Sequence, residues 1–435
     1  MPSPEPFTRV RGSGLLSAFS RVTTSGGFIP EIDGLRFVAI TAVLVFHLGL
    51  NLASRNPADF GLAEGSALRR VVLSGDFGVQ LFFIVSGFVL ALPFARHLLL
   101  AGPPVSLKAY FRRRVTRLEP PYIIVMVGAF LLLVVVHGRS ARSLLPHLLA
   151  SLGYLHTVIY GQDSLINNVA WSLEVEIQFY LLVPWLTVVF AVRNAATRRA
   201  VLAALIVVTS IVGPLLAGSS AHLENTILRF AQYFLVGFLL ADLWTLRELT
   251  PARRNPLWDL AAVGSLVLGI FLHSGAGLHS LQDAVSLLLL PWVCFIAYLA
   301  VFRGVVVNAV LTWPLLTTVG GMCYSIYLLH NLLLNNTLTF TKGLAPFGWY
   351  PADLALQALI MLPCIVAASA GFFVLIERPC MDKNWPQHLR AWARHQNRHQ
   401  SRNQNRNPAR QETELDGADR PGDVGGLGHG HLPAP

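Results

Sequence analysis

The sequence has 435 residues, of which 54% are apolar and only 13% charged, and its mean hydropathy is +0.54. Soluble domains carry about a quarter charged residues, so this composition excludes an ordinary soluble protein. The net charge of +10 does not indicate nucleic-acid binding, because the basic residues are spread over loops and a tail between apolar segments. That distribution fits contact with anionic membrane lipids.

Apolar runs of roughly 17–23 residues, long enough to cross a hydrocarbon core about 30 Å thick, recur along the chain. Backbone groups in lipid must be satisfied within a segment, so we predict an all-α polytopic membrane protein, a bundle of about ten transmembrane helices. The predicted spans are residues 33–51, 71–95, 119–137, 171–191, 200–217, 227–245, 257–274, 284–301, 311–332 and 354–376. The stretch 144–160 suits an interfacial or re-entrant helix, which leaves an eleventh span open.

The loop charges predict the orientation and the domain limits. If the N-terminus is cytoplasmic, most loop arginines lie inside, so both termini are placed in the cytoplasm and the protein in the inner (plasma) membrane as a multi-pass protein. Residues 1–30 form a cytoplasmic arm without a cleavage-site pattern. Residues 31–380 form one transmembrane domain. Residues 381–435, rich in Arg, Asn, Gln and His and then in Gly and Pro, predict a disordered basic cytoplasmic tail.

The first span contains Arg36 and His47. Ionisable side chains at membrane depth are costly and usually face a bundle interior or a wet cavity. Eleven helical steps turn only about 20° beyond three full turns and rise roughly 16 Å, so both side chains are expected on one helix face. This face is expected to line the bundle interior or a wet cavity. The alternative is a snorkelling arginine beside a hydrogen-bonded structural histidine.

The second span is interrupted by Ser86, Gly87 and Phe88. A Ser-Gly step permits close approach either by another helix or by a ligand, and both remain open. The following loop carries Arg114 and Arg117, which share a helix face at the inner surface because they are three residues apart. This pair fits the inside-positive topology, and it also fits a bidentate grip on phosphates.

The fourth span opens with Glu174 and Glu176, on the predicted outer side. Acids at a helix start are often dipole partners, but an acid beside apolar surface also suits proton transfer. Tyr180 follows Glu176 by one turn and shares its face. In the ninth span, Tyr327 and His330 share a face in the same way. The four cysteines form no CxxC pair and predict neither a disulfide framework nor a metal site.

Together these segments resemble the acyltransferase 3 family of membrane acyltransferases. The matching segments, in family order over roughly residues 31–380, are Arg36 with His47, FGVQLFFIVSGF, the pair Arg114 and Arg117, WSLEVEIQFY, YSIYLLH and Glu377-Arg378-Pro379. In the family's W-S-L-x-x-E pattern the acid falls on Glu176, whereas Glu174 occupies a variable place. Many relatives carry an extra span and a hydrolase-like domain after the tenth span. The short polar tail leads us to expect no such domain here.

The resemblance implies transfer of an acyl group, usually acetyl, from cytoplasmic acyl-CoA to a sugar hydroxyl of a surface or exported glycan or a glycosylated metabolite. It implies acyl-CoA as donor substrate, with no tightly bound cofactor and no metal. His47 is the expected general base and Glu176 the group that orients an imidazole or the acceptor, with a covalent acyl-histidine as a less favoured variant. The expected donor-binding residues are Arg36, Arg114, Arg117, Ser86, Gly87 and Phe88. The expected supporting residues are Trp171, Tyr180, Tyr327 and His330, while Glu377 and Arg378 are expected to be structural.

The main alternative is a transporter or a flippase of a lipid-linked or small-molecule substrate, since buried Arg, His and Glu serve such proteins equally well. The sequence shows no inverted repeat, which weighs against it. A membrane scaffold is disfavoured because too many polar groups lie at membrane depth. The expected partners are acyl-CoA, a glycan or glycosylated acceptor and membrane lipids, and not nucleic acid.

Overall fold

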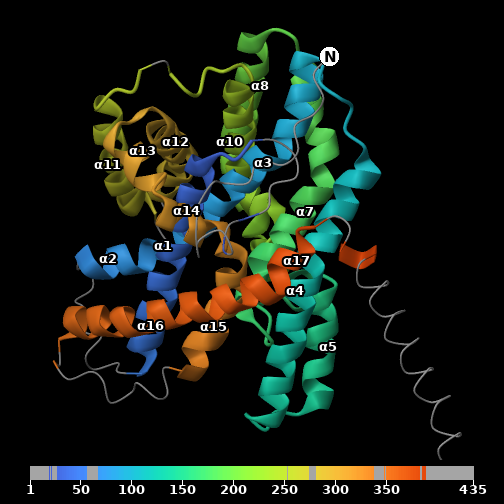
Figure 1. Ribbon diagram of the computed structural model, residues 1–435, viewed down its shortest axis with the longest axis vertical. Helices are drawn as coiled ribbons and strands as arrows, with labels where there is room; N and C mark the ends of the chain where they lie inside the picture. The colour runs from blue at the N-terminus through green and yellow to red at the C-terminus, as the bar shows by residue number, and fades with distance from the viewer. Residues whose placement is uncertain are drawn as a thin grey trace, which may run out of the picture. The chain divides into compact units, whose positions relative to one another are not determined.

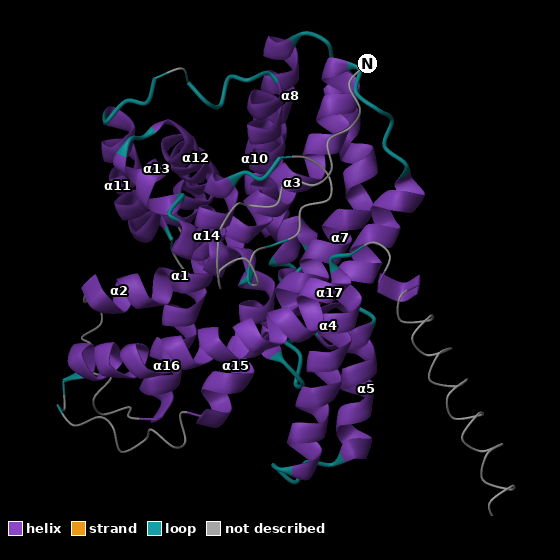
Figure 2. Cartoon of the chain, viewed as in Figure 1, coloured by secondary structure: helices purple, strands orange, loops and turns teal. Residues whose placement is uncertain are grey.

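The computed structural model describes residues 19, 21, 27–55, 67–251, 253–273, 281–337, 347, 349–382 and 385–387. This part of the chain is helical and contains no β-strand (Figures 1 and 2). Eight of its helices are long and apolar enough to cross a membrane. The predicted fold class, an all-α polytopic membrane protein, is therefore confirmed. Most of the predicted N-terminal arm and nearly all of the predicted tail lie outside the described residues.

The chain divides into two compact units, Met1–Asp382 and Lys383–Pro435, and the helices named below belong to the first. In chain order they are α1 (Pro30–Arg55), α2 (Ala67–Leu73), η2 (Ser74–Phe77), α3 (Gly78–Leu100), α4 (Leu107–Val135), α5 (Ala141–Leu152), α6 (His156–Tyr160), η3 (Asn168–Ala170), α7 (Trp171–Leu186), η4 (Thr187–Ala191), α8 (Ala195–Ala217), α9 (Ala221–Glu224), α10 (Ile227–Thr245), α11 (Leu257–Leu272), α12 (Leu281–Arg303), α13 (Val306–Leu311), α14 (Pro314–Gly321), α15 (Cys323–Thr337), α16 (Tyr350–Phe372), η5 (Phe373–Glu377, a π-helical turn) and α17 (Arg378–Cys380).

Two predicted spans differ from the helices observed. The seventh, 257–274, is α11, which is apolar but only 16 residues long. The ninth, 311–332, is not one helix, because α14 ends at Gly321 and α15 starts at Cys323. Proline at the start of α14 and two glycines at its end explain the short helix, since proline favours a first turn and glycine weakens a helix interior. The stretch 144–160 is likewise divided between α5 and α6.

The most extensive helix contact among the described residues joins α3 to α10, and α3 also packs against α1 (Figure 1). Glycines make the first of these contacts close. A side chain at Gly87 would place its Cβ 2.2 Å from the carbonyl oxygen of Phe234, and one at Gly237 would place its Cβ 2.4 Å from that of Ile84. The two backbones therefore touch where either helix lacks a side chain. In Figure 1, α16 runs across α15 and α1, which it contacts.

This contact predicts that Gly87→Val destabilises the fold. The added side chain has no space beside α10, and overpacking of this kind costs about 1–3 kcal/mol. Thermal unfolding of the detergent-purified protein, followed by size-exclusion chromatography, measures the loss. Gly371→Val in α16 is the matched control, because nothing lies within 4 Å of its Cβ position. Equal unfolding temperatures for the two variants would contradict the role of this contact.

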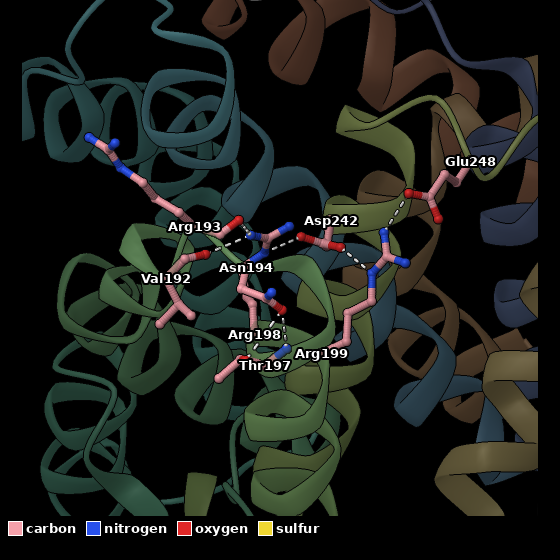
Figure 3. Close-up of polar contacts among 8 residues, drawn as sticks. All are labelled: Val192, Arg193, Asn194, Thr197, Arg198, Arg199, Asp242 and Glu248. Atoms are coloured by element: carbon pink, nitrogen blue, oxygen red, sulfur yellow. Dashed lines mark hydrogen bonds and ion pairs between the residues drawn. The ribbon is translucent and has the colours of Figure 1, made fainter.

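A buried ion-pair cluster joins α8 to α10 (Figure 3). Asp242 accepts from Arg198 Nε at 2.5 Å and from Arg199 Nε at 2.7 Å. Arg198 is 1% exposed and Asp242 is fully buried, and the Arg198 guanidinium also donates to the Val192 carbonyl oxygen at 2.6 Å. Arg199 extends the cluster to Glu248 at 2.7 Å, near the protein surface. The acid thus holds two cations of the neighbouring helix.

Candidate active site

Two cavities lie at different ends of α1. The first, which we call the arginine cavity, has a volume of about 120 Å³. Its charged lining residues are Arg21, Arg36, Arg114, Arg117, Glu176 and Glu377. The second, which we call the amide cavity, has a volume of about 500 Å³. Its polar lining residues are His47, Asn51, Asp76, Asp163, Asn168, Asn225, Tyr327, Asn331 and Asn335. Val79 and Tyr327 line both cavities, so the two spaces meet at these side chains.

The arginine cavity has an excess of positive charge. Arg36, near the start of α1, is hydrogen-bonded to Asp33, which also pairs with Arg21 at 3.5 Å. Arg114 of α4 lies over the ring of Tyr180, with 5.3 Å from its guanidinium carbon to the ring centroid. Arg117 points into the same space, and its Nε has no hydrogen-bond partner among the described residues. A partly buried cation with a buried, unfilled donor atom is suited to an anionic ligand.

The two acids of the fourth predicted span have different surroundings. Glu176 lines the arginine cavity and accepts a hydrogen bond from Ser86 of α3. Glu174 is 1% exposed and accepts from the backbone N–H groups of His156 (3.2 Å) and Thr157 (2.9 Å). It therefore fixes the start of α6, which is the role of a helix-capping acid. Glu176 alone of the pair faces the space where a ligand can enter.

Ser86, Gly87 and Phe88 have different surroundings: the first lines a cavity and the other two pack between helices. Ser86 lines the arginine cavity, as expected for a donor-binding residue. Gly87 instead contacts the α10 backbone, and Phe88 is fully buried with its ring edge-on to Trp244, at 6.1 Å between centroids. Neither of these two lines either cavity. The Ser-Gly step could allow close approach by a helix or by a ligand. At Gly87 the structure shows a helix, because the α10 backbone contacts this residue.

His47 lines the amide cavity and lies next to His330, with ring centroids 5.0 Å apart. His330 is fully buried, and its Nδ1 lies 2.7 Å from the Tyr327 carbonyl oxygen and 3.2 Å from that of Ile326. A carbonyl oxygen can only accept, so Nδ1 carries the proton and Nε2 is an acceptor. That Nε2 has no hydrogen-bond partner among the described residues. A buried acceptor atom is thus held beside the imidazole of His47.

Arg36 and His47 line different cavities, although they share α1. Eleven residues of helix separate them by roughly 16 Å along the axis. The wall between the cavities includes Tyr327, whose hydroxyl is hydrogen-bonded to the Ser172 hydroxyl at 2.6 Å and to the Val169 carbonyl oxygen at 3.1 Å. Trp171, at the start of α7, lines the amide cavity, and Tyr180 lines the arginine cavity. The predicted site residues therefore fall into a cationic group and a histidine group.

Several lining residues were missed by the sequence analysis. Arg21 belongs to the predicted cytoplasmic arm, and nothing in its sequence neighbours indicates a cavity residue. Glu377 was expected to be structural. Its Oε2 does accept from the hydroxyl (2.5 Å) and backbone N–H (3.1 Å) of Ser325, but the residue also lines the arginine cavity. The amides left a signal, because Asn331 and Asn335 lie one helical turn apart at the end of an apolar span.

These features define a polytopic helical membrane protein with two polar cavities that meet at Val79 and Tyr327, one of them cationic and the other amide-rich. The sequence model of the acyltransferase 3 family, described as an acyltransferase domain, matches residues 29–378. The chain therefore belongs to this family, as its motifs predicted.

Named relatives agree with the predicted class of enzyme, an acyltransferase. The chain is 24% identical to acyltransferase MdmB of Streptomyces mycarofaciens over 387 residues, which is 81% of this chain and 92% of the relative. It is also 24% identical to the putative peptidoglycan O-acetyltransferase YrhL of Bacillus subtilis, over 81% of this chain and 55% of the relative. It is 30% identical to the peptidoglycan O-acetyltransferase OatA of Listeria monocytogenes over 178 residues, 38% of this chain and 25% of the relative. In these matches the chain spans about half the length of YrhL and about a quarter of the length of OatA. No solved structure matches it.

Proposed function

We propose that the protein is an O-acyltransferase of the inner (plasma) membrane. It moves an acyl group, usually acetyl, from cytoplasmic acyl-CoA to a hydroxyl of a sugar in a surface or exported glycan or a glycosylated metabolite. The observation that carries this proposal is the meeting of the two cavities at Tyr327, with cations on one side and His47 on the other. The names of the relatives, which include peptidoglycan O-acetyltransferases, support it.

The arginine cavity would receive the donor. On the predicted orientation its four arginines (Arg21, Arg36, Arg114 and Arg117) lie toward the cytoplasm, whereas Glu176 lies deeper in the bundle. The phosphates of acyl-CoA would meet these arginines, because arginine binds phosphate oxygens in a bidentate way. A volume of about 120 Å³ is below that of a site for a whole small molecule, about 300 Å³ or more. The cavity therefore admits the narrow pantetheine arm while the nucleotide stays at its mouth. The arm passes Ser86, whose hydroxyl donates a hydrogen bond to the Glu176 carboxylate.

The amide cavity would hold the reacting hydroxyl. His47 takes the proton of this hydroxyl as general base, and the oxygen attacks the thioester carbonyl carbon delivered past Tyr327. The carbon–sulfur bond breaks, the ester forms, and the imidazolium returns the proton to the CoA thiolate. Nε2 of His330 can accept the other N–H of His47 and so hold it in one tautomer. Because Glu176 lines the other cavity, its role is assigned to the donor and not to the imidazole.

Acetyl transfer in inverted membrane vesicles tests the function. Vesicles that contain the protein are expected to move radiolabel from acetyl-CoA into a base-labile glycan or lipid fraction, whereas vesicles without it leave the label in CoA. Absence of transfer together with uptake of a labelled glycoside or lipid-linked sugar would favour a transporter instead.

Replacing Arg117 by glutamine is expected to raise the KM for acetyl-CoA about 10- to 100-fold with a smaller change in kcat, because a hydrogen bond to a charged group contributes about 1.5–3 kcal/mol. Initial rates over a range of acetyl-CoA concentrations measure the effect. Arg113→Gln is the matched control, since Arg113 is exposed on the same helix and lines neither cavity. An unchanged KM in Arg117→Gln would remove this arginine from donor binding.

A further inference from the structure

The amide cavity has the opposite electrostatic character to the arginine cavity. Asp76 and Asp163 line it, and among the described residues no arginine or lysine does. Its other polar groups, apart from His47 and Tyr327, are the five amides of Asn51, Asn168, Asn225, Asn331 and Asn335. Four cations line the other cavity. The two cavities are therefore suited to ligands of different charge.

The amides are held in place but keep hydrogen-bonding capacity. Asn331 donates to the Asn168 side-chain oxygen at 2.5 Å, and Asn225 donates to a carboxylate oxygen of Asp163 at 3.1 Å. An amide offers two N–H groups and an oxygen with two lone pairs, and a carboxylate has two acceptor oxygens. One bond to a neighbour therefore leaves donors or acceptors on the side chains of these two pairs, Asn331 with Asn168 and Asn225 with Asp163. These remaining groups match the hydroxyls of a sugar, which both donate and accept.

The apolar part of the lining also fits a sugar ring. Trp171, Phe46 and Tyr327 present aromatic surface to the same space as the amides. Aromatic faces pack well against the C–H groups of a pyranose ring, and Tyr and Trp combine apolar area with a polar end. The volume of about 500 Å³ lies in the usual range of small-molecule sites, about 300–1,000 Å³. The cavity is therefore large enough for one or two sugar rings.

We propose that the amide cavity is the acceptor site and that it selects an uncharged sugar ring against an anionic one. The inference rests on the proposed function for its link to acyl transfer. The carboxylates of Asp76 and Asp163 repel a second carboxylate or a phosphate, and no cation of the cavity offsets them. Asp76 lies 2.7 Å from His273 Nε2, whereas the partner found for Asp163 is the neutral amide of Asn225. Asp163 is therefore the main determinant of the selection.

Ligand binding in lipid nanodiscs tests the selection without acyl-CoA. The probes are 4-nitrophenyl glucoside and 4-nitrophenyl glucuronide, which differ by one carboxylate and quench tryptophan fluorescence. The difference in quenching between wild type and Trp171→Phe reports binding in the cavity. At low ionic strength the glucoside is expected to bind at least about tenfold more tightly than the glucuronide, from Coulomb repulsion over a few ångströms.

Charge reversal at Asp163 gives the decisive comparison. Asp163→Lys is expected to reduce the glucoside preference at least about tenfold, because repulsion becomes attraction. Glu248→Lys makes the same charge change on an exposed residue that lines neither cavity and pairs with Arg199 beyond the opposite end of α10, so it should leave the preference within about threefold. A preference that Asp163→Lys does not change, equal binding of both glycosides by wild type, or no quenching that depends on Trp171 would each overturn the inference.

The same nanodiscs separate this inference from the proposed function. Radiolabelled acetyl-CoA is added with each glycoside after the binding measurement. Selective binding without acetyl transfer would leave the charge selection standing and count against the acyltransferase proposal. Transfer to glucoside and glucuronide at equal kcat/KM would support the acyltransferase and overturn the selection.

Discussion

Replacing His47 by alanine is expected to lower acyl transfer about 10²- to 10⁴-fold, the contribution of a positioned general base. The side chain lines the amide cavity, beside the unfilled acceptor Nε2 of His330. The lower rate should appear as a decrease in kcat. The KM for acetyl-CoA should change little, because the proposed donor residues line the other cavity. Transfer of radiolabel in inverted vesicles at matched protein levels measures both constants.

His222→Ala is the control for this variant. His222 is an exposed histidine of α9 that binds the Val158 carbonyl oxygen at 2.8 Å and lines neither cavity. Its loss should leave the rate within about twofold, as for a surface substitution away from the site. If His47→Ala and His222→Ala transferred the label at the same rate, the imidazole of His47 would have no part in the chemistry.

The cationic half of the site was predictable because its signals are local. Arg36, Arg114 and Arg117 are ionisable residues at or near the ends of apolar spans. A charged side chain in such a place is costly unless it faces a polar interior or a cavity. Ser86 and Glu176 lie within motifs shared with a family, and the structure brings all five into one cavity. Helical periodicity then fixes which side of each helix these residues occupy.

Much of the amide cavity was not predictable, because its polar residues other than His47, Trp171, Tyr327 and the pair Asn331 and Asn335 come from segments with no common pattern. Asp76 follows a short helix, Asp163 lies in a loop, and Asn225 ends α9. Only tertiary packing brings these polar residues together around His47. Arg36 and His47 line different cavities although both belong to α1, because Tyr327 of α15 lies in the wall between the cavities. The sequence of α1 alone does not show this wall.

The ends of the predicted spans show that average hydropathy does not detect where the backbone starts or ends a helix. Residues 311–332 are apolar enough to predict one helix, but Pro314 starts a new helix and Gly320 and Gly321 end it. Gly320 is required there by packing, because a Cβ at this position would lie 1.8 Å from the Asp33 carbonyl oxygen. The close contact of α14 with α1 thus fixes the start of the helix that carries Arg36. A hydropathy average cannot detect such a contact.

Replacing Asp242 by alanine is expected to destabilise the protein by about 3–5 kcal/mol, because it leaves a buried arginine without its counter-ion. Arg198 is 1% exposed and would keep only the Val192 and Arg193 carbonyl oxygens as partners. Thermal unfolding in detergent, followed by loss of the monodisperse elution peak, measures the change. Asp242→Asn, which keeps the shape and one acceptor oxygen, should fall between alanine and wild type.

Glu248→Ala separates the buried part of this cluster from its exposed part. Glu248 also binds Arg199, at 2.7 Å, but its side chain is 46% exposed, so its loss should cost at most about 1 kcal/mol. Equal unfolding temperatures for Asp242→Ala and wild type would show that Arg198 finds water when its partner is removed. A large loss confined to Asp242→Ala would show that α8 is held to α10 by this acid. Because α10 in turn packs on α3 through Gly87 and Gly237, the cluster would then support the helix that carries Ser86 into the arginine cavity.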